Sequence, residues 1–462
     1  MATYDYDLLV LGSGSGGFTA ARTARDRGLE RILVCEKRRL GYSLCTNEGC
    51  MPSKTLLASA AIKNAVDRAA QFGIDAPSAA VDWRRVQRRM RHLVEEDFFS
   101  ARRDMIERSG IEIAPGAAQF MDAHTISVGE KTVTADKIVI ATGSSTSAPA
   151  IPGLADVGFI DSDRALYLDE LPSSIIVVGA GYIGVELGYL MHEMGVRTTI
   201  LQRSGHILSR LDADIGTELQ RLMRLQGIDV ITDVRIKEVV SGTPGKTVLA
   251  ITPKGERSVS ADEILVVTGR RPASDELGLE RAGIATDEYG AIVVDEFMRT
   301  TQSHVYAVGD VNGQMPLVYA ATMEGQVAGA NASGGELATM DYRCVAGVVF
   351  SHPEVGAVGL TEAEARAAGH DVIIETTPMA DIGKAVAIGE TGGFVKLIAA
   401  RPTGEILGVH IVGPHATDVV QVALPHLYHH DTVFDVLRIP YPHPTLGEAL
   451  SYAAEEIAER LA

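Results

Sequence analysis

The residues that decide the fold are YDLLVLGSGSGGFTAARTARDRGLERILVCE, from Tyr6 to Glu36. A short apolar strand over Tyr6–Leu11 runs into three glycines in G-x-G-x-x-G spacing, namely Gly12, Gly14 and Gly17. The pattern predicts a helix over Phe18–Arg27 and a second strand over Arg31–Cys35, closed by Glu36. Such glycines let the backbone approach a pyrophosphate, the helix N-terminus favours its charge, and the acid accepts from ribose hydroxyls. This unit therefore predicts a Rossmann-like dinucleotide-binding domain.

The same pattern recurs in the middle of the chain. A strand over Ile175–Val178 leads into GAGYIG, whose glycines are Gly179, Gly181 and Gly184. A helix through Met194 and a strand over Arg197–Leu201 are predicted to follow, which gives a second dinucleotide site. Where an acid would select an unphosphorylated ribose, this strand ends in Gln202 and Arg203. An arginine there can pair with a 2′-phosphate and favours NADPH, although an ordinary exposed arginine is the alternative.

A cysteine pair lies in LCTNEGCMPSKTLL, Leu44 to Leu57, which holds Cys45 and Cys50. Pro52 is tolerated in the first turn of a helix, so Cys50 is predicted just before a helix N-terminus. The exposed N–H groups there lower a thiol's pKa and favour the reactive thiolate. Shorter spacing and a second ligand pair would be needed for a metal, so no metal site is expected. Two buried, unreactive cysteines are the alternative reading of the spacing.

Composition limits the partners and the compartment. The chain has 462 residues, which predicts about three domains, and its net charge of −18 argues against nucleic acid or an anionic membrane as a partner. Neither a signal peptide nor an apolar run of about 18 residues is present, so no membrane span is expected. With only four cysteines in the chain, a cytoplasmic protein with one redox-active pair is expected, and Cys35 and Cys344 are expected in the core.

Later stretches add candidates at strand ends. KIVIATGSS, Lys137–Ser145, ends at Thr142 and Gly143, where a strand can pass beside a bound cofactor. ILVVTGRRP, Ile264–Pro272, repeats this pattern of an apolar strand that ends in Thr-Gly. VYAVGDV is predicted as a strand with Asp310 at its tip, from which a carboxylate can meet a ligand hydroxyl.

The end of the chain reads YPHPTLGEAL before a final helix. His443 and Glu448 are five residues apart, and Pro444 restricts the backbone between them. A histidine oriented by a carboxylate is a general base with raised basicity, whereas the plainer reading is a surface histidine beside an acid. Upstream, Thr361 and Glu364 are predicted to cap a helix.

Together these motifs resemble the FAD-dependent pyridine nucleotide-disulfide oxidoreductases along essentially the whole chain, most closely the dihydrolipoamide dehydrogenases. The matching pieces, in the family's order, are GSGSGG with its acid, CTNEGCMPSK, IATGSS, GAGYIGVE, TGRRP, VGDV and HPTLGE. The resemblance implies an α/β fold with two Rossmann-like dinucleotide-binding domains and a C-terminal α+β dimerisation domain. FAD would bind residues 1–149 and 273–343, NAD(P) would bind residues 150–272, and residues 344–462 would form the dimer interface.

The resemblance also implies roles for single residues. Cys45 corresponds to the thiol that attacks substrate sulfur, and Cys50 to the thiol that contacts the flavin. Lys54 corresponds to a lysine near the flavin ring, paired with Glu186. In the expected homodimer, His443 and Glu448 would complete the partner's site, with His443 taking a proton from the dithiol. Positions that match FAD contacts are Gly12, Gly14, Gly17, Glu36, Lys54, Ala118, Thr142, Gly143, Asp310 and Leu317. Positions that match nicotinamide-nucleotide contacts are Gly179, Gly181, Gly184, Glu186, Gln202, Arg203, Gly269 and Arg270.

Several residues depart from the family pattern. Tyr42-Ser43-Leu44 replaces the Gly-Gly-Thr whose backbone usually approaches the FAD phosphates. Tyr319 and Tyr441 stand where histidines are common. Glu48, between the two cysteines, would oppose a nearby thiolate by like charge.

The expected function is electron transfer between a dithiol/disulfide and NAD(P) through FAD and a redox-active Cys45–Cys50 pair. Dihydrolipoamide dehydrogenase, acting on a lipoyl-type carrier or a small disulfide, fits best because of HPTLGE. Mercuric reductases usually carry an extra C-terminal cysteine pair that this chain lacks, so mercury reduction is not expected. The alternatives are an NADPH-dependent reductase of another small disulfide, of the glutathione-reductase or mercuric-reductase type, and a flavin-binding redox subunit without turnover.

Overall fold

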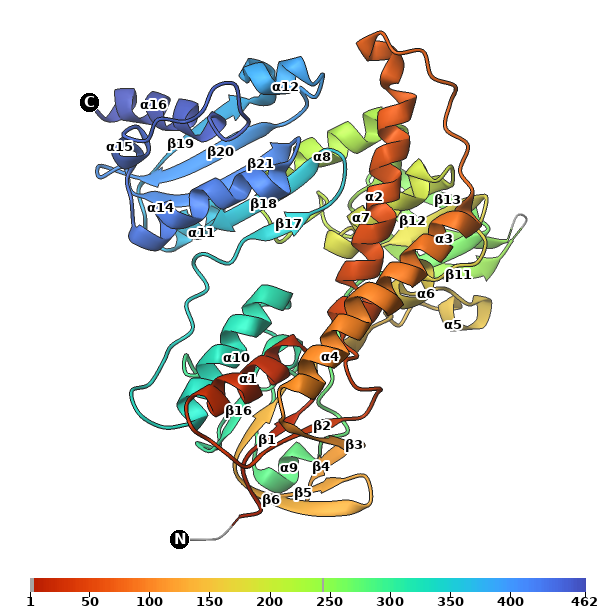
Figure 1. Cartoon of the computed structure of the whole chain (residues 1–462). Helices are drawn as coiled ribbons and strands as arrows, with labels where there is room; N and C mark the ends of the chain where they lie inside the picture. Colours follow the sequence, from red (N-terminus) through yellow and green to blue (C-terminus); the bar gives the residue numbers. More distant parts are fainter. Residues whose placement is uncertain (1–3, 243–244) are drawn as a thin grey trace. The chain divides into compact units, whose positions relative to one another are not determined.

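The computed structural model describes residues 4–242 and 245–462, which divide into two compact units (Figure 1). The first unit takes in residues up to Ser53 together with Arg88–Ser147 and Arg270–Tyr342. The second unit comprises Lys54–Gln87, Ala148–Gly269 and Arg343–Ala462. The chain therefore passes between the units several times, and each unit is described by itself.

The first unit contains a sheet with the strand order β3-β2-β1-β6-β5-β4, and β16 also pairs with β6. The strands β1, β2, β3 and β16 run parallel to their neighbours, while β4 and β5 form an antiparallel extension. Strands buried on both faces need apolar runs, and β1 and β2 supply them. The strands are β1 (Tyr6–Leu11), β2 (Ile32–Glu36), β3 (Glu112–Pro115), β4 (Ala118–Phe120), β5 (Thr125–Val128), β6 (Lys131–Ile140) and β16 (Val305–Ala307).

Helix α1 (Ser15–Asp26) packs closely against helix α10 (Val318–Ala332), because glycines remove side chains at the crossing. A Cβ on Gly325 would lie 2.3 Å from the backbone oxygen of Gly16, and one on Gly329 would lie 2.4 Å from that of Ala20. The other elements that include residues of this unit are η1 (Leu44–Glu48), α2 (Cys50–Asp67), α3 (Trp83–His92), η3 (Leu93–Phe99), α4 (Ser100–Arg108), β7 (Ser144–Thr146), β15 (Arg270–Pro272), α9 (Leu279–Ala282) and η4 (Gly309–Asn312).

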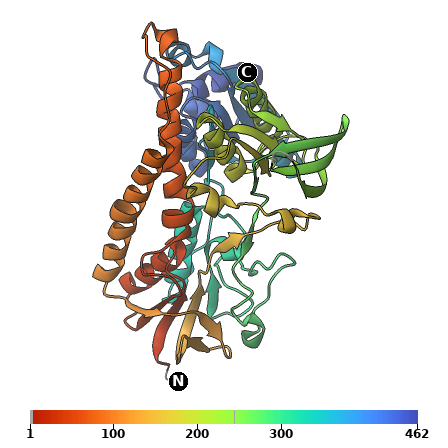
Figure 2. The same ribbon diagram turned by 90° about the vertical axis from the view of Figure 1, so that its right-hand side faces the viewer.

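The second unit contains a parallel sheet with the order β10-β9-β8-β14. An antiparallel sheet, β11-β12-β13, is drawn in green in Figure 2. The elements of this region are η2 (Ala69–Phe72), α5 (Leu154–Val157), α6 (Ser162–Leu166), β8 (Ser174–Val178), α7 (Tyr182–Glu193), β9 (Arg197–Leu201), α8 (Ala213–Leu225), β10 (Asp229–Ile231), β11 (Arg235–Ser241), β12 (Lys246–Thr252), β13 (Gly255–Ala261) and β14 (Glu263–Val266).

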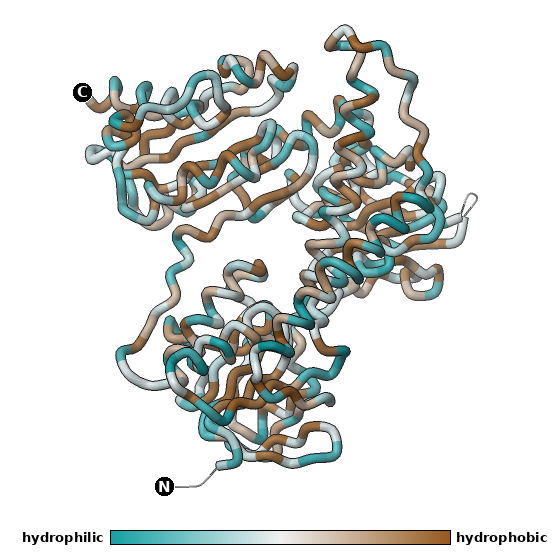
Figure 3. Tube along the Cα trace, viewed as in Figure 1, coloured by the Kyte–Doolittle hydropathy of each residue, from teal (hydrophilic) through white to brown (hydrophobic). Residues whose placement is uncertain are grey.

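The C-terminal part of the second unit is an antiparallel sheet with the order β17-β18-β21-β20-β19. Helix α16 (Ala449–Leu461) buries Ala453, Ala454 and Ile457 in the same core as Leu397 and Ile411 of the sheet. Hydrophobic residues follow these strands in Figure 3. The other elements are β17 (Gly347–Val349), β18 (Glu354–Gly359), α11 (Glu362–Ala367), β19 (Val372–Pro378), η5 (Met379–Asp381), α12 (Gly383–Ala387), β20 (Phe394–Ala400), β21 (Ile406–Gly413), α13 (Ala416–Val419), η6 (Val420–Ala423), α14 (Leu424–His429) and α15 (Val433–Val436).

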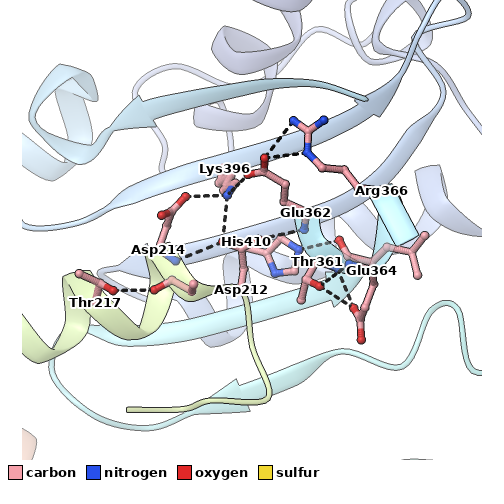
Figure 4. A network of polar contacts seen from close by, with 11 residues as sticks. Asp212, Asp214, Thr217, Thr361, Glu362, Glu364, Arg366, Lys396 and His410 are labelled. Atoms are coloured by element: carbon pink, nitrogen blue, oxygen red, sulfur yellow. Dashed lines mark hydrogen bonds and ion pairs between the residues drawn. The ribbon is translucent and has the colours of Figure 1, made fainter. Parts of the chain in front are cut away.

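A buried lysine links this C-terminal sheet to helix α8 of the same unit (Figure 4). The side chain of Lys396, on β20, is 2% exposed, and its Nζ lies 2.9 Å from Asp212, 2.6 Å from Asp214 and 3.0 Å from Glu362. Asp212 caps α8, and Glu362 is the first residue of α11. A buried ammonium is tolerated only when it is paired and hydrogen-bonded, and these carboxylates satisfy that need.

The predicted fold class, α/β with two Rossmann-like domains and an α+β C-terminal domain, is confirmed. The four predicted domain segments stay a prediction. Besides shifts of one residue at the ends of other elements, α1 begins inside the glycine motif at Ser15. Strand β16 ends at Ala307, so that Asp310 lies in a 3₁₀ turn rather than at a strand tip. In the described part of the chain, no helix combines the length and the apolar character that crossing a bilayer requires.

Candidate functional site

The glycine loop of the first unit combines close backbone packing with open space at its middle glycine. A Cβ on Gly12 would lie 2.4 Å from the oxygen of Ala141, and one on Gly17 would lie 2.1 Å from the oxygen of Gly12. A Cβ on Gly14 would have only one neighbour within 4 Å, the oxygen of Ala141 at 4.0 Å. The outer glycines thus serve close packing, while the middle one leaves space where a ligand can approach the N-terminus of α1.

The second unit repeats this geometry at the start of α7. Cβ atoms on Gly179 and Gly184 would lie 2.6 Å and 2.0 Å from backbone oxygens of Val267 and Gly179, respectively. A Cβ on Gly181 would meet nothing within 4 Å. Two loops with the same division between packed and open glycines fit two dinucleotides.

In each Rossmann-like repeat, a side chain at the end of the second strand holds the glycine loop by hydrogen bonds. Glu36 is 8% exposed, and its Oε2 accepts from the backbone N–H and the hydroxyl of Ser13 at 3.0 and 2.7 Å. In the repeat, Gln202 is 9% exposed and its Oε1 accepts from the N–H of Ala180 at 3.0 Å. Gln202 therefore keeps the structural contact of the acid without its charge. Arg203, the next residue, is exposed to solvent, where it can reach a ligand.

A polar chain joins the predicted strand-end residues of the first unit. The hydroxyl of Ser144 donates to Oδ2 of Asp310 at 2.6 Å and accepts from Nε of Arg270 at 2.8 Å. The hydroxyl of Thr142 donates to the backbone oxygen of Ala273 at 2.8 Å. The IATGSS and TGRRP stretches thus meet as the antiparallel pair β7–β15, a pairing that their separate motifs did not predict.

A buried carboxylate that the sequence analysis did not single out supports the loop of Asp310. Glu324 is fully buried, and it accepts from the N–H of Gly309 at 2.5 Å, Nδ2 of Asn312 at 2.9 Å and the hydroxyl of Tyr342 at 2.8 Å. Burial raises the pKa of Glu324 above its ordinary value, against the lowering effect of these hydrogen bonds. The signal available in sequence was an acid inside an otherwise uncharged helix.

The two candidate redox cysteines bracket a tight turn in the first unit. Cys45 lies in η1, a π-helical turn, and Cys50 is the first residue of α2, so the expected position of Cys50 at a helix start is observed. Between them, a Cβ on Gly49 would lie 3.1 Å from the oxygen of Leu44 and 3.9 Å from Cα of Cys45. The backbone thus folds back on itself, and both cysteines are partly accessible.

Ser43, part of the departure from the family pattern, caps this turn. Its Oγ accepts from the N–H of Thr46 at 3.1 Å and donates to the hydroxyl of Thr46 at 2.8 Å. Glu48 lies 2.8 Å from Nη1 of Arg38, and this ion pair offsets the charge that was expected to oppose a thiolate. Tyr319 replaces a common histidine; burial and the electrostatic influence of Cys50 raise the pKa of Tyr319 to about 12.

The other cysteines differ from this pair in their surroundings. Cys35 is 2% exposed, and burial, with a smaller contribution from Glu36, raises the pKa of the Cys35 thiol to about 12. Cys344 is half-buried, and its Sγ lies 3.8 Å from the backbone oxygen of Leu424. The expected core position therefore holds for Cys35 and only partly for Cys344.

The predicted pair of Lys54 and Glu186 is present in the second unit. Nζ of Lys54 lies 2.6 Å from Oε2 of Glu186, and the other carboxylate oxygen accepts from the N–H of Phe350 at 3.1 Å. The same ammonium lies 4.6 Å from the centre of the Phe350 ring. Two contacts thus hold the ammonium of Lys54 and a third holds its partner Glu186, while 29% of the lysine side chain stays exposed.

The predicted pair of His443 and Glu448 is also present. Nδ1 of His443 lies 3.0 Å from Oε2 of Glu448, and the side chains are 71% and 5% exposed. A buried carboxylate thus orients an exposed imidazole whose Nε2 can face a substrate. Nearby, the hydroxyl of Tyr441 lies 3.4 Å from Nε2 of His426, whose Nδ1 lies 2.8 Å from Asp431.

The remaining predicted contact positions lie in separate elements. Ala118 begins β4, Leu317 precedes α10, and Gly143 lies at a positive φ of 74° with open space on its Cβ side. Gly269 is likewise open on that side, at a φ of 153°.

Comparison with known proteins gives consistent matches along the chain. Residues 6–325 match the family described as pyridine nucleotide-disulphide oxidoreductase, and residues 345–454 match its dimerisation domain. A dihydrolipoyl dehydrogenase of Bacillus subtilis is 36% identical over 98% of both chains. A mercuric reductase of Staphylococcus aureus is 34% identical over 97% of this chain and 82% of its own.

A solved structure resembles the whole chain at lower identity. The Cu(II) complex of the HOCl-induced flavoprotein disulfide reductase RclA from Escherichia coli superimposes with a TM-score of 0.84 at 27% identity. The superposition covers 99% of this chain and 100% of the other.

Proposed function

Because the chain belongs to the pyridine nucleotide-disulphide oxidoreductase family, which uses FAD and NAD(P), we propose that it transfers electrons between a small dithiol/disulfide and NAD(P) through Cys45 and Cys50. The main support for this proposal is the placement of the two cysteines. Cys45 lies in a π-helical turn, and Cys50 is the first residue of the helix α2 that follows. Both lie in the unit that holds the glycine loop, Glu36 and Asp310. The C-terminal dimerisation domain implies a homodimer.

The sulfur chemistry follows from the positions of the two cysteines. A thiolate of a dithiol substrate attacks Cys45 and breaks the Cys45–Cys50 disulfide, which leaves Cys50 as a thiolate at the N-terminal end of α2. The second substrate thiol then displaces Cys45, so that the substrate leaves as a disulfide and two electrons remain on the cysteine pair. The helix start stabilises the anionic sulfur of Cys50 through its exposed N–H groups.

The other residues handle charge and protons. His443, oriented by Glu448, accepts the proton that the attacking thiol must lose, and in the homodimer it does so for the partner's site. Lys54, held by Glu186, supplies a fixed positive charge on the helix that Cys50 begins. FAD, when bound, carries the electron pair between sulfur and nicotinamide. Glu36 and Asp310 would hold its hydroxyl groups, and Gly179, Gly181 and Gly184 would admit the nicotinamide nucleotide.

We favour a dihydrolipoyl group as the substrate, with the enzyme in the cytoplasm. HPTLGE resembles the lipoamide enzymes, and the Bacillus relative named dihydrolipoyl dehydrogenase aligns over 98% of both chains. A second candidate is an NADPH-dependent reductase of another small disulfide. The observation that favours it is the uncharged Gln202, followed by an exposed Arg203, at the end of β9. Because Gln202 stands where an acid is usual, no carboxylate at this position repels the 2′-phosphate of NADPH.

Steady-state assays test the proposal and separate the candidates. With dihydrolipoamide as donor, the parent enzyme should reduce NAD⁺ or NADP⁺, and Cys45→Ser should abolish turnover while FAD stays bound. A parent rate in Cys45→Ser would refute the role of that thiol. Turnover of small disulfides with NADPH, but none of dihydrolipoamide, would favour the second candidate. Bound FAD without turnover of any disulfide would point instead to a redox subunit.

A further inference from the structure

The segment before the redox cysteines reads Tyr42-Ser43-Leu44, where the resembled family has Gly-Gly-Thr. Ser43 is 5% exposed and its hydroxyl is used within the turn, where it bonds Thr46. Gly41 faces helix α4, because a Cβ on it would lie 3.0 Å from Cα of Arg103. Helix α4 thus lies beside this segment, and it carries a second arginine, Arg102.

Arg102 reaches the glycine loop of the first unit. Its Nη2 donates to the backbone oxygen of Ser13 at 2.6 Å. Its Nε is buried and has no hydrogen-bond acceptor among the described residues. Burial lowers the pKa of Arg102, while Cys45 and Glu36 raise it through their charges. The guanidinium of Arg102 therefore lies close enough to Glu36 and to Cys45 to interact with both electrostatically.

In the part of the chain that the structure describes, no carboxylate forms a hydrogen bond with the half-buried Arg102, although Glu36 and Cys45 act on its charge. The oxygens of Glu36 accept from other donors, Oε2 from Ser13 and Oε1 from the N–H of Arg38 at 2.9 Å. A buried N–H without an acceptor, such as Nε of Arg102, is costly unless an acceptor is supplied from elsewhere. Arginine matches phosphate oxygens with paired donors, and the loop that Arg102 touches is the one whose middle glycine is open.

We propose that Arg102 binds the pyrophosphate of FAD and takes over the contact that Gly-Gly-Thr makes in other members of the family. The full positive charge of Arg102 would then offset the negative charges of the two phosphates near Gly14. The backbone N–H groups of the helix N-terminus carry only partial positive charges. The inference rests on FAD binding to the first glycine loop, as proposed above, and does not depend on which disulfide is the substrate.

The test compares full-length Arg102→Gln, Arg102→Lys and Arg103→Gln holoenzymes with the parent. Release of FAD on dilution is followed by flavin fluorescence, and ³¹P NMR reports the two phosphates of bound FAD. Glutamine ends where Nε lies, so Arg102→Gln removes both the charge and the contact of Nη2 with the oxygen of Ser13. Arg102→Lys keeps the charge, and the phosphate resonances separate a contact with FAD from a purely structural contact with Ser13. Arg103 is the matched control, because it lies on the same helix and pairs with Asp104 at 3.0 Å on the exposed side.

Arg102→Gln should release FAD about 10- to 100-fold faster and shift a phosphate resonance, as loss of charged hydrogen bonds predicts. Arg102→Lys should fall between Arg102→Gln and the parent, and Arg103→Gln should match the parent. Parent-like release and phosphate resonances in Arg102→Gln would overturn the inference while leaving the proposed function intact. A parent enzyme without FAD would instead defeat the proposed function. If Arg102→Gln fails to fold, the lysine variant decides, because unchanged phosphate resonances there contradict the contact.

Discussion

At the residue scale, the proposed chemistry depends on differences in burial among the cysteines. Cys45 and Cys50 flank a turn and are partly accessible, whereas Cys35 is 2% exposed inside β2. Because only the thiolate reacts with electrophiles, burial should protect Cys35 even when the protein is reduced.

Alkylation of the reduced protein tests this contrast. With iodoacetamide at pH 8, Cys45 should be labelled first, and Cys35 should stay unlabelled until the chain is denatured. A thiol whose pKa is about 12 holds on the order of 1,000-fold less thiolate at that pH than an ordinary thiol. Peptide mass spectrometry gives the order of labelling. Labelling of Cys35 at the rate of Cys45 in the native protein would contradict the assignment.

The pair formed by His443 and Glu448 leads to a second prediction at this scale. His443→Gln should lower kcat for dithiol oxidation by about 10²- to 10⁴-fold, the usual contribution of a general base, with FAD content unchanged. His429→Gln is the control, since His429 is another exposed histidine of the same unit. A kcat within twofold of the parent in His443→Gln would remove this residue from the mechanism.

Single residues also show what the sequence could and could not predict. Lys54–Glu186 and His443–Glu448 were predicted from motif resemblance, and both pairs are in contact. Arg270, whose contact with the nicotinamide nucleotide stays a prediction, bonds Ser144 within the first unit. That contact depends on the pairing of β7 with β15, residues 126 positions apart, and no local pattern encodes it.

At the element scale, the turn that carries Cys45 depends on its cap. Ser43→Ala removes the acceptor for the N–H of Thr46 and should destabilise the protein by about 1 kcal/mol, the usual effect of losing a cap. Urea unfolding measures the stability, and faster alkylation of Cys45 in the reduced protein should report the loosened turn. Exposed Ser209 provides the control Ser209→Ala. Unchanged stability and labelling in Ser43→Ala would show that the cap does not hold the turn.

Regular elements were predictable, and irregular ones were not. The bounds of β1 and β9 agree with the prediction, because continuous apolar runs between turn residues define a buried strand. The capping box of Thr361 and Glu364 is present as predicted. The π-helical turns η1 and η3 have no comparable sequence signature, since the extra residue in each depends on packing rather than on periodicity.

At the scale of the whole molecule, Lys396 joins helix α8 to the C-terminal sheet of its unit. Its partners Asp212 and Glu362 lie 150 positions apart in the sequence, so only the folded chain brings them together. Lys396→Met should destabilise the protein by about 3–5 kcal/mol, because it leaves the buried carboxylate of Asp212 without a counter-charge. Urea unfolding measures this loss, and Lys237→Met, at an exposed pair with Glu256, should change little.

The same cluster predicts how stability depends on pH. Burial opposes ionisation of Asp212, yet the N–H of Glu362 and the ammonium of Lys396 hold the pKa of Asp212 below its ordinary value. The hydrogen bond from Lys396 likewise lowers the pKa of Glu362. A carboxyl group whose pKa is lowered by folding stabilises the folded state at pH values above its pKa in the unfolded chain, which is about 4. This stability is lost as the pH falls through the lower pKa of the folded state. Lys396→Met should therefore lose less stability than the parent between pH 5 and pH 3. An equal or larger loss in the variant would contradict this linkage.

The proposed reaction requires Cys45 and Cys50 to exchange electrons with bound FAD. Anaerobic titration of the parent holoenzyme with dihydrolipoamide, with thiols counted at each step, follows this exchange. The first equivalent should produce the long-wavelength absorbance band of a thiolate beside oxidised flavin, together with new thiols at Cys45 and Cys50. Direct bleaching of the flavin by that first equivalent, with no band and no new thiol at either cysteine, would contradict the account.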